Sequence, residues 1–339
     1  MNIFNNFSLK TYNTFGIEAF ADSFIEVTET LQLQEICKAG SFKKMPKLIL
    51  GGGSNILLTG NFCGLVLKIS NKGIVKLQED SDYVWLRIEA GENWHQLVNY
   101  CVSHEYGGIE NLSLIPGTVG AAPVQNIGAY GVEFQQVFVE LEAMQIANGS
   151  FHQFSHQECK FSYRNSIFKH LLKNQFIITS VILKLARKPT VFHLEYKDLK
   201  NMLLQMNITE PTLKEVSEAI CKIRQIKLPN PENVANAGSF FKNPEISNDH
   251  FFLLQKKFPD MPFYLLSDQY YKIPAGWLIE QCGWKGVKKG QVGVYGNHSL
   301  VLVNYGEGTG LELKQLANDI QESVYKRFGI TLEPEVNII

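Results

Sequence analysis

The sequence predicts an α+β protein with more than one domain. A length of 339 residues is sufficient for two or three domains, and a hydrophobic share of 45% with a charged share of 19% describes an ordinary globular chain with an ample core. Patterns of strand and of helix occur on both sides of residues 227–231, Lys-Leu-Pro-Asn-Pro, where the composition changes. We take this stretch as a domain boundary.

The composition disfavours several classes of protein. The net charge is −1 and the runs of Lys and Arg are short, whereas a nucleic-acid-binding protein carries a visible basic patch. No apolar run has membrane-spanning length, and the first residues lack the basic start and apolar middle of a signal peptide. The six cysteines are scattered without a Cys-x-x-Cys pair, which indicates reduced thiols rather than a disulfide framework or a zinc site. We expect a cytoplasmic protein with no metal, no nucleic acid and no membrane partner.

Hydrophobic periodicity predicts the elements before the boundary. The expected strands are residues 23–28, 47–50, 65–69, 73–78, 83–90, 137–146 and 176–185. The expected helices are residues 29–38, stopped by Gly40, residues 93–105 and residues 211–226. His95 and His104 lie on the second of these helices, and because a lone helical histidine is more often structural or exposed than catalytic, neither receives a role.

The elements after the boundary are shorter. The expected helices are residues 249–258, 275–282 and 309–328, the last ending at Gly329, and the expected strands are residues 291–294, 300–304 and 331–336. Residues 236–244 form a turn that places Ser239 and Lys242 beside two aromatic side chains. The final strand carries an acid, Glu335, in its middle.

A first glycine cluster, Gly-Gly-Gly-Ser-Asn at residues 51–55, directly follows an apolar strand. Main-chain N–H groups in such a turn can surround a pyrophosphate. The cluster is not a Walker motif, because no Gly-Lys-Ser/Thr follows, and it is not a dinucleotide fingerprint, because it does not open a helix. We interpret it as a phosphate-binding turn; a glycine hairpin is the alternative.

A second stretch, residues 114–131, carries four glycines, two prolines and no charged side chain. Surface loops are normally polar, and core elements normally exclude Gly and Pro, so packing alone does not explain it. We call these residues the cradle, and we interpret them as a neutral set of main-chain donors around a large ligand with phosphates. A small-residue turn between two sheets explains the same composition, and the residues alone leave both interpretations open.

Arg164 is a third candidate for ligand binding, because it lies in a segment with few carboxylates that could pair with it. A planar guanidinium is suited to hold a ligand carboxylate or phosphate. A surface arginine is the alternative.

These motifs together closely resemble the UDP-N-acetylenolpyruvoylglucosamine reductase family, over nearly the whole chain and in the right order. They are Thr-Phe-Gly at 14–16, residues 51–55, Ile-Pro-Gly-Thr-Val-Gly-Ala-Ala-Pro at 115–123, Gln-Asn-Ile-Gly-Ala-Tyr-Gly at 125–131, Tyr-Arg-Asn-Ser at 163–166, Ile-Arg-Gln-Ile-Lys-Leu-Pro at 223–229, Gly-Ser-Phe-Phe-Lys-Asn-Pro at 238–244, Ala-Gly-Trp-Leu-Ile at 275–279 and Leu-Glu-Pro-Glu-Val at 332–336. Residues 195–199, Glu-Tyr-Lys-Asp-Leu, resemble the tyrosine loop of the longer, type I members.

The resemblance implies a fold and an activity. The fold is an FAD-binding domain of the p-cresol-methylhydroxylase/vanillyl-alcohol-oxidase type, residues 1–226 with subdomains of about 1–70 and 71–226, followed by an α+β substrate-binding domain at 227–329 and a C-terminal strand at 330–339. The activity is the NADPH-dependent reduction of UDP-N-acetylglucosamine enolpyruvate to UDP-N-acetylmuramate in peptidoglycan synthesis. Hydride passes from N5 of FAD to C3 of the enolpyruvyl group, and a proton is added at C2.

The resemblance also implies roles for single residues. Arg164 and Glu335 flank the enolpyruvyl carboxylate, and Ser239 donates the proton. The expected substrate-binding residues are Tyr196, Lys227, Asn243 and Gln281. The expected cofactor-binding residues are Gly51, Gly52, Gly53, Ser54, Asn55, Ile115, Pro116, Gly117, Thr118, Gly120, Ala121, Gln125, Asn126, Gly128 and Ala129.

Two further classes remain open at this stage. One is a flavin oxidase of the same fold that acts on an alcohol or sugar, and the other is a nucleotide-binding protein without catalysis. Because the cradle contains no Cys, His or Lys, we expect non-covalent FAD, and we expect a monomer.

Overall fold

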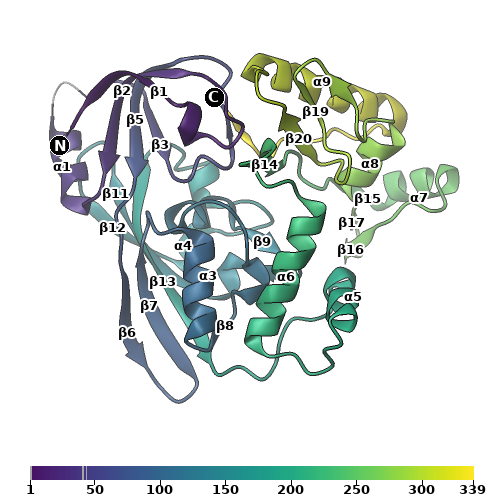
Figure 1. Ribbon diagram of the computed structural model, residues 1–339, viewed down its shortest axis with the longest axis horizontal. Helices are drawn as coiled ribbons and strands as arrows, with labels where there is room; N and C mark the ends of the chain where they lie inside the picture. Colours follow the sequence, from purple (N-terminus) through teal and green to yellow (C-terminus); the bar gives the residue numbers. More distant parts are fainter. Residues whose placement is uncertain (1, 40–41, 43) are drawn as a thin grey trace. The chain divides into compact units, whose positions relative to one another are not determined.

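The computed structural model describes residues 2–39, 42 and 44–339. It divides into two compact units, drawn in Figure 1. Unit 1 comprises Met1–Phe7, Ala21–Gly53 and Phe62–Ile226, and unit 2 comprises Ser8–Phe20, Ser54–Asn61 and Lys227–Ile339. Two short N-terminal segments therefore group with the C-terminal unit, which the sequence pattern does not indicate.

The first sheet of unit 1 is largely parallel. Its order is β1 (Phe4–Ser8), β2 (Phe20–Val27), β5 (Phe62–Ile69) and β3 (Lys47–Leu50). The strands β2, β5 and β3 are parallel to one another. The central residues of β2 and β5 are mostly buried and apolar, as is usual for parallel strands covered on their faces. Helix α1 (Thr30–Lys38) contributes Leu33 and Ile36 to the same core.

The second sheet of unit 1 is antiparallel and holds the larger core. Its order is β12 (Phe151–Ser155), β11 (Phe138–Gln145), β13 (Phe176–Arg187), β7 (Tyr83–Glu89) and β6 (Ile74–Glu79), with β8 (Tyr106–Gly107) paired to β13. Helix α3 (Trp94–Ser103) buries Trp94, Leu97, Val98 and Cys101 in the cluster that also contains the alternate, inward residues of β7. The cradle begins beyond this helix, so the sheet and α3 form the scaffold behind it.

Short elements form part of the cradle and of the segments before and after it in the chain. They are η2 (Glu110–Leu112), η3 (Val119–Ala121), η4 (Pro123–Gln125), the hairpin β9 (Gly128–Ala129) and β10 (Val132–Glu133), η5 (Phe134–Gln136), α4 (His156–Cys159) and η6 (Ile167–Lys169). Helices α5 (Lys197–Gln205) and α6 (Leu213–Lys227) complete the unit and pack together in a separate apolar cluster.

Unit 2 contains a four-stranded sheet with the order β14 (Ala235–Ser239), β20 (Val301–Asn304), β19 (Val292–Val294) and β18 (Lys288–Lys289). A smaller sheet has the order β15 (Glu245–Ser247), β17 (Tyr270–Lys272) and β16 (Tyr264–Ser267). The remaining elements are η1 (Lys10–Tyr12), α7 (Asn248–Lys257), α8 (Ala275–Gln281), α9 (Gly310–Phe328) and the parallel pair β4 (Ile56–Leu57) and β21 (Asn337–Ile338).

Most expected elements are confirmed to within a few residues at each end. The expected strand at residues 331–336 is wrong. Pro334 forms only an isolated bridge with Phe241, and regular pairing begins later, in β21. Proline has no N–H to donate to a ladder, which accounts for the interruption. Glu335 therefore lies in a bend and not in a strand, and the expected stop at Gly40 lies outside the described residues.

No helix among the described residues combines the length and the apolar character needed to cross a membrane. The six cysteines all lie in the described part of the chain and are free thiols.

Candidate cofactor and substrate site

Two glycine-rich stretches that are far apart in sequence lie against each other within unit 1, at Gly51 and Gly52 of the first and Gly117 and Thr118 of the second. A Cβ atom added to Gly52 would lie 2.8 Å from the Cα of Gly117, and one added to Gly51 would lie 2.6 Å from Oγ1 of Thr118. A larger residue at either position would push the turns apart. The first glycines are therefore needed for the close approach of two backbones, which brings both predicted ligand-binding stretches into one place.

The surface formed by these turns suits a large ligand that carries phosphates. Gly52, Pro116 and Ala121 are exposed, although neither turn carries a charge. Gly53 and Gly117 have φ angles of 65° and 119°, the left-handed conformations from which anion-binding nests of N–H groups are built. An exposed strip of uncharged main chain with small side chains fits FAD, whose pyrophosphate needs donors and whose ring system needs room.

Lys68 adds a positive charge beside the first turn. Its Nζ donates a hydrogen bond to the carbonyl of Gly51 at 2.8 Å. Burial lowers the pKa of Lys68, and the carboxylate of Glu26 acts in the opposite direction. Nothing in the sequence distinguishes this strand residue from a surface lysine.

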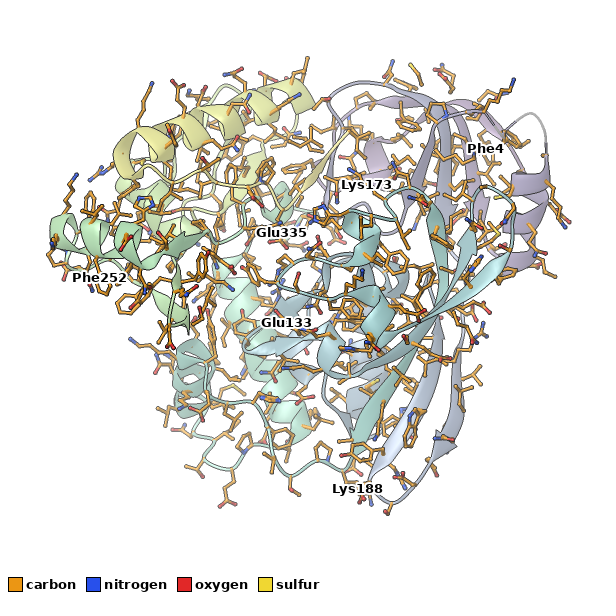
Figure 2. The ribbon with its side chains drawn as sticks, turned by 180° about the vertical axis from the view of Figure 1, so that it is seen from behind. Phe4, Glu133, Lys173, Lys188, Phe252 and Glu335 are labelled. Atoms are coloured by element: carbon orange, nitrogen blue, oxygen red, sulfur yellow. The ribbon has the colours of Figure 1, made fainter. Side chains whose placement is uncertain are left out.

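The side chain of Asn126, a residue expected to bind the cofactor, bonds to neighbouring protein groups. The residue is buried with a φ of 45°. Its Nδ2 donates to Glu133 (labelled in Figure 2) at 2.9 Å and to the carbonyl of Ser162 at 3.1 Å, and its Oδ1 accepts from the N–H of Gln135 at 3.0 Å. These bonds tie the cradle to the turn at Ser162 and to Glu133 and Gln135.

Arg164 lies beside the cradle. It occupies a tight turn in which Ser162 and Asn165 exchange main-chain hydrogen bonds of 3.1 Å, and its φ is 51°. A left-handed conformation is unusual for arginine, and such strain is concentrated at functional sites. The half-buried guanidinium donates to the carbonyl of Gly128, at the far end of the cradle. This position favours the ligand-binding interpretation over an isolated surface arginine.

Tyr196 packs edge-to-face on Tyr130, with ring centroids 5.2 Å apart. Burial raises the pKa of the Tyr130 phenol, while the hydrogen-bonded guanidinium of Arg224 lowers it. Nε of Arg224 also donates to the carbonyl of Leu114 at 3.3 Å, so α6 contacts the start of the cradle. Arg224 lies within one of the motifs quoted above, yet the sequence offers no reason to give it a role.

In unit 2, Ser239 follows a local irregularity of the sheet. The pairing of β14 with β20 shifts register between Asn236 and Ser239, and Gly238 within the shift has a φ of 70°. The N–H of Gly238 donates to Oδ1 of Asn236 at 2.9 Å. Such bulges bend a strand and re-aim its next side chain, and they are frequent beside active sites.

Glu335, labelled in Figure 2, lies next to this strand. Its N–H donates to the carbonyl of Phe240, the residue after Ser239, at 2.7 Å. Nδ2 of Asn55 donates to the carbonyl of Glu335 at 3.3 Å. Unit 2 thus brings together two expected catalytic residues and the end of the first glycine cluster.

The remaining expected residues of unit 2 are placed by main-chain contacts. Oδ1 of Asn243 accepts a hydrogen bond from the N–H of Ala275, the first residue of α8, at 2.9 Å. Gln281 ends that helix, and its carbonyl accepts from Arg327 of α9. Lys227 is the last residue of α6, where unit 2 resumes.

Two family models match the chain. The model of the UDP-N-acetylenolpyruvoylglucosamine reductase C-terminal domain matches residues 230–339, and that of an FAD binding domain matches residues 21–155. The UDP-N-acetylenolpyruvoylglucosamine reductases of Flavobacterium johnsoniae and Amoebophilus asiaticus are 50% and 49% identical to this chain over 339 residues. Each alignment covers 100% of this chain and 100% of the relative. The chain belongs to the UDP-N-acetylenolpyruvoylglucosamine reductase family.

Solved structures confirm the expected fold. The crystal structure of the UDP-N-acetylenolpyruvylglucosamine reductase of Thermus caldophilus aligns with a TM-score of 0.69, at 23% identity, over 99% of this chain and 98% of that chain. A p-cresol methylhydroxylase with bound substrate aligns with a TM-score of 0.51, at 12% identity, over 97% and 84% of the two chains. The FAD-binding type named from the family motifs and the α+β character of the chain are both supported.

Replacing Gly117 with valine is expected to abolish FAD binding. A branched residue is strained at a φ of 119°, and Gly117 lies where the two turns meet. The measurement is the flavin-to-protein absorbance ratio of the purified variant. Gly60→Val is the matched control, because a Cβ at Gly60 meets no atom within 4 Å and its φ is ordinary. Normal flavin content in Gly117→Val would show that this turn has only a structural role.

Proposed function

We propose that this chain reduces UDP-N-acetylglucosamine enolpyruvate to UDP-N-acetylmuramate with NADPH and FAD, in peptidoglycan synthesis, through the residues described above. Membership of the family identifies the chain as an FAD-dependent oxidoreductase. The observation that carries the assignment to residues is the hydrogen bond between the N–H of Glu335 and the carbonyl of Phe240, because it places Glu335 beside the strand of Ser239.

The two glycine-rich turns bind the cofactor. When bound, FAD accepts hydride from NADPH and supplies it from N5 to C3 of the enolpyruvyl group. The turn at residues 51–55 and the cradle offer main-chain N–H groups to the phosphates, and Lys68 offsets part of their charge. Gly51, Gly52 and Thr118 lie where the two turns are in contact, so these residues shape the site as well as lining it.

Arg164 binds the carboxylate of the substrate. Addition of hydride to C3 builds negative charge on C2 and its carboxylate, and a pre-positioned guanidinium stabilises that charge. The hydrogen bond from Arg164 to Gly128 and the left-handed backbone of Arg164 fix its guanidinium before the substrate arrives. Pre-organised donors of this kind need no rearrangement during the reaction.

Ser239 donates a proton to C2, and Glu335 lies next to it. A hydroxyl is a weak acid, but a carbanion-like carbon is basic enough to accept its proton. The bulge at Gly238 sets the direction of the Ser239 side chain, while its main chain stays paired with Val301. We assign Tyr196, Lys227, Asn243 and Gln281 to contacts with the UDP-sugar.

We infer a cytoplasmic location and a monomeric enzyme whose partners are its UDP-sugar substrate and NADPH. The free thiols, including the exposed Cys63, suit a reducing compartment.

The purified full-length chain is expected to be yellow and to release its FAD on acid precipitation, because no Cys, His or Lys lies within the cradle to form a covalent link. It should oxidise NADPH only after the enolpyruvyl substrate is added, which is followed at the absorbance of NADPH. Flavin that stays with the precipitated protein would contradict non-covalent binding. Oxidation of an alcohol or sugar without NADPH would instead identify an oxidase of the same fold.

A further inference from the structure

The first turn of α3 is hydrogen-bonded to the start of the cradle and to the residues just before it. Nε1 of Trp94 donates to the carbonyl of Leu112 at 3.0 Å, and the main-chain N–H of Trp94 donates to the carbonyl of Gly117 at 3.1 Å. Between these two bonds, Nδ1 of His95 accepts a hydrogen bond from the N–H of Leu114 at 3.0 Å. Three consecutive contacts therefore hold the segment that leads into the phosphate-binding turn.

Leu114 is the strained residue of this segment. Its φ is 58°, a left-handed conformation that a leucine rarely adopts without support from its surroundings. Its N–H is bonded to His95 of α3, and its carbonyl accepts from Nε of Arg224 of α6 at 3.3 Å. Both polar groups of one strained residue are thus held by side chains from two different helices.

We propose that His95 is a positioning residue for the FAD-binding cradle, because its Nδ1 fixes Leu114 in the left-handed conformation from which residues 115–118 start. The proposal rests on the proposed function only in that the cradle binds FAD. His95 does not itself touch the reacting atoms; it acts through Leu114.

The direction of this hydrogen bond defines the protonation state of His95. A ring nitrogen that accepts from an N–H carries no proton, so the imidazole is neutral with its proton on Nε2. Burial lowers the pKa of His95, and the positive charge of Arg224 on α6 lowers it further. Asn99 on the same helix is uncharged. Among the described residues, Arg224 is the charged group that acts on this ring.

Protonation should therefore weaken the cradle. An imidazolium has donors on both nitrogens, so it cannot accept from Leu114 and the strained conformation loses its support. Because the pKa of His95 is lowered from its ordinary value of about 6.5, the neutral ring persists at neutral pH. Affinity for FAD should be constant above about pH 7 and should fall as the pH decreases through the lowered pKa.

Two substitutions test the proposal by FAD titration of the full-length apoprotein, followed by flavin fluorescence from about pH 5 to about pH 8. His95→Leu removes the acceptor and should weaken FAD binding by roughly tenfold at neutral pH, the loss typical of one buried hydrogen bond. His95→Asn places an oxygen near the position of Nδ1 and cannot be protonated in this range. It should bind FAD within about threefold of the unsubstituted chain at neutral pH and show no loss at low pH.

His104→Leu is the matched control. His104 caps the other end of α3, where its Nδ1 lies 2.8 Å from the carbonyl of Tyr100, and its loss should leave both the affinity and its pH dependence unchanged. Unchanged FAD binding by His95→Leu would overturn the positioning role. So would a pH profile in His95→Asn that matches the unsubstituted chain, since another group would then be titrating. Failure of the unsubstituted chain to bind FAD would overturn the proposed function itself.

Discussion

Replacing Arg164 with lysine is expected to slow the oxidation of reduced flavin by the enolpyruvyl substrate by roughly 10²–10³-fold, the range found when one donor to developing negative charge is lost. Lysine keeps the positive charge and the same backbone requirement at a φ of 51°. It loses the planar fork that can bond the carbonyl of Gly128 and a carboxylate at the same time. The slower reaction should therefore come from the changed end of the side chain at position 164 and not from its charge or its backbone.

Stopped-flow absorbance separates the two half-reactions of this variant. Bleaching of the flavin by NADPH should keep nearly its original rate, whereas recovery of the flavin absorbance on addition of substrate should be slow. Arg87→Lys is the matched control, since Arg87 lies in β7 and is ion-paired with Glu89 at 2.9 Å, on the large sheet of the same unit. If Arg164→Lys turns over at nearly the rate of the unsubstituted chain, Arg164 is a surface arginine that does not bind the substrate.

Local signals in the sequence were sufficient for most of the elements. Helix α9 is an example, because Thr309 and Glu312 form a capping box at its start and Gly329 adopts a φ of 66° at its end. These signals involve residues within one helical turn of each other, so they can be recognised without knowledge of the rest of the fold. The strand expected at residues 331–336 failed because the partner of this segment, Phe241, is distant in the sequence and Pro334 interrupts the ladder.

The two glycine-rich stretches were recognised, but the reason for their glycines was only partly apparent. Each stretch by itself indicates backbone exposed to a ligand. The structure adds a second requirement, since Gly52 meets the main chain of Gly117 and Gly51 meets Thr118. A close approach between segments so far apart leaves no local pattern.

Supporting residues were the hardest to predict. His95 looks like any helical histidine in the sequence, and its importance depends on the strained conformation of Leu114, which only the fold reveals. Asn126 is a second case, because its side chain bonds to Ser162 and Glu133, which the sequence does not indicate. A sequence motif names a residue but not which of its atoms contact protein, and cofactor binding by Asn126 stays a prediction.

Ser239→Ala is the second change for which a large effect is expected, and it separates proton delivery from every other function of the site. A residue that only protonates C2 is idle while NADPH reduces the flavin. Loss of its hydroxyl should therefore leave FAD content and flavin bleaching by NADPH almost unchanged. Recovery of the flavin absorbance by substrate should fall by roughly 10²–10⁴-fold, the usual contribution of a general acid. The fold should tolerate the change, because Ser239 pairs with Val301 through the main chain.

Two further variants make the test of Ser239 specific. Ser239→Cys should recover part of the rate, because a thiol is nearly isosteric with the hydroxyl and is the stronger acid. Ser323→Ala, in the half-buried middle of α9, is the matched control and should react like the unsubstituted chain. Stopped-flow traces of both half-reactions decide between the possibilities. One contrary result is that Ser239→Ala slows flavin reduction and flavin reoxidation equally, and another is that it leaves reoxidation by the substrate unaffected. Either result would show that Ser239 is a structural residue of the bulge and that the proton comes from Glu335 or from water.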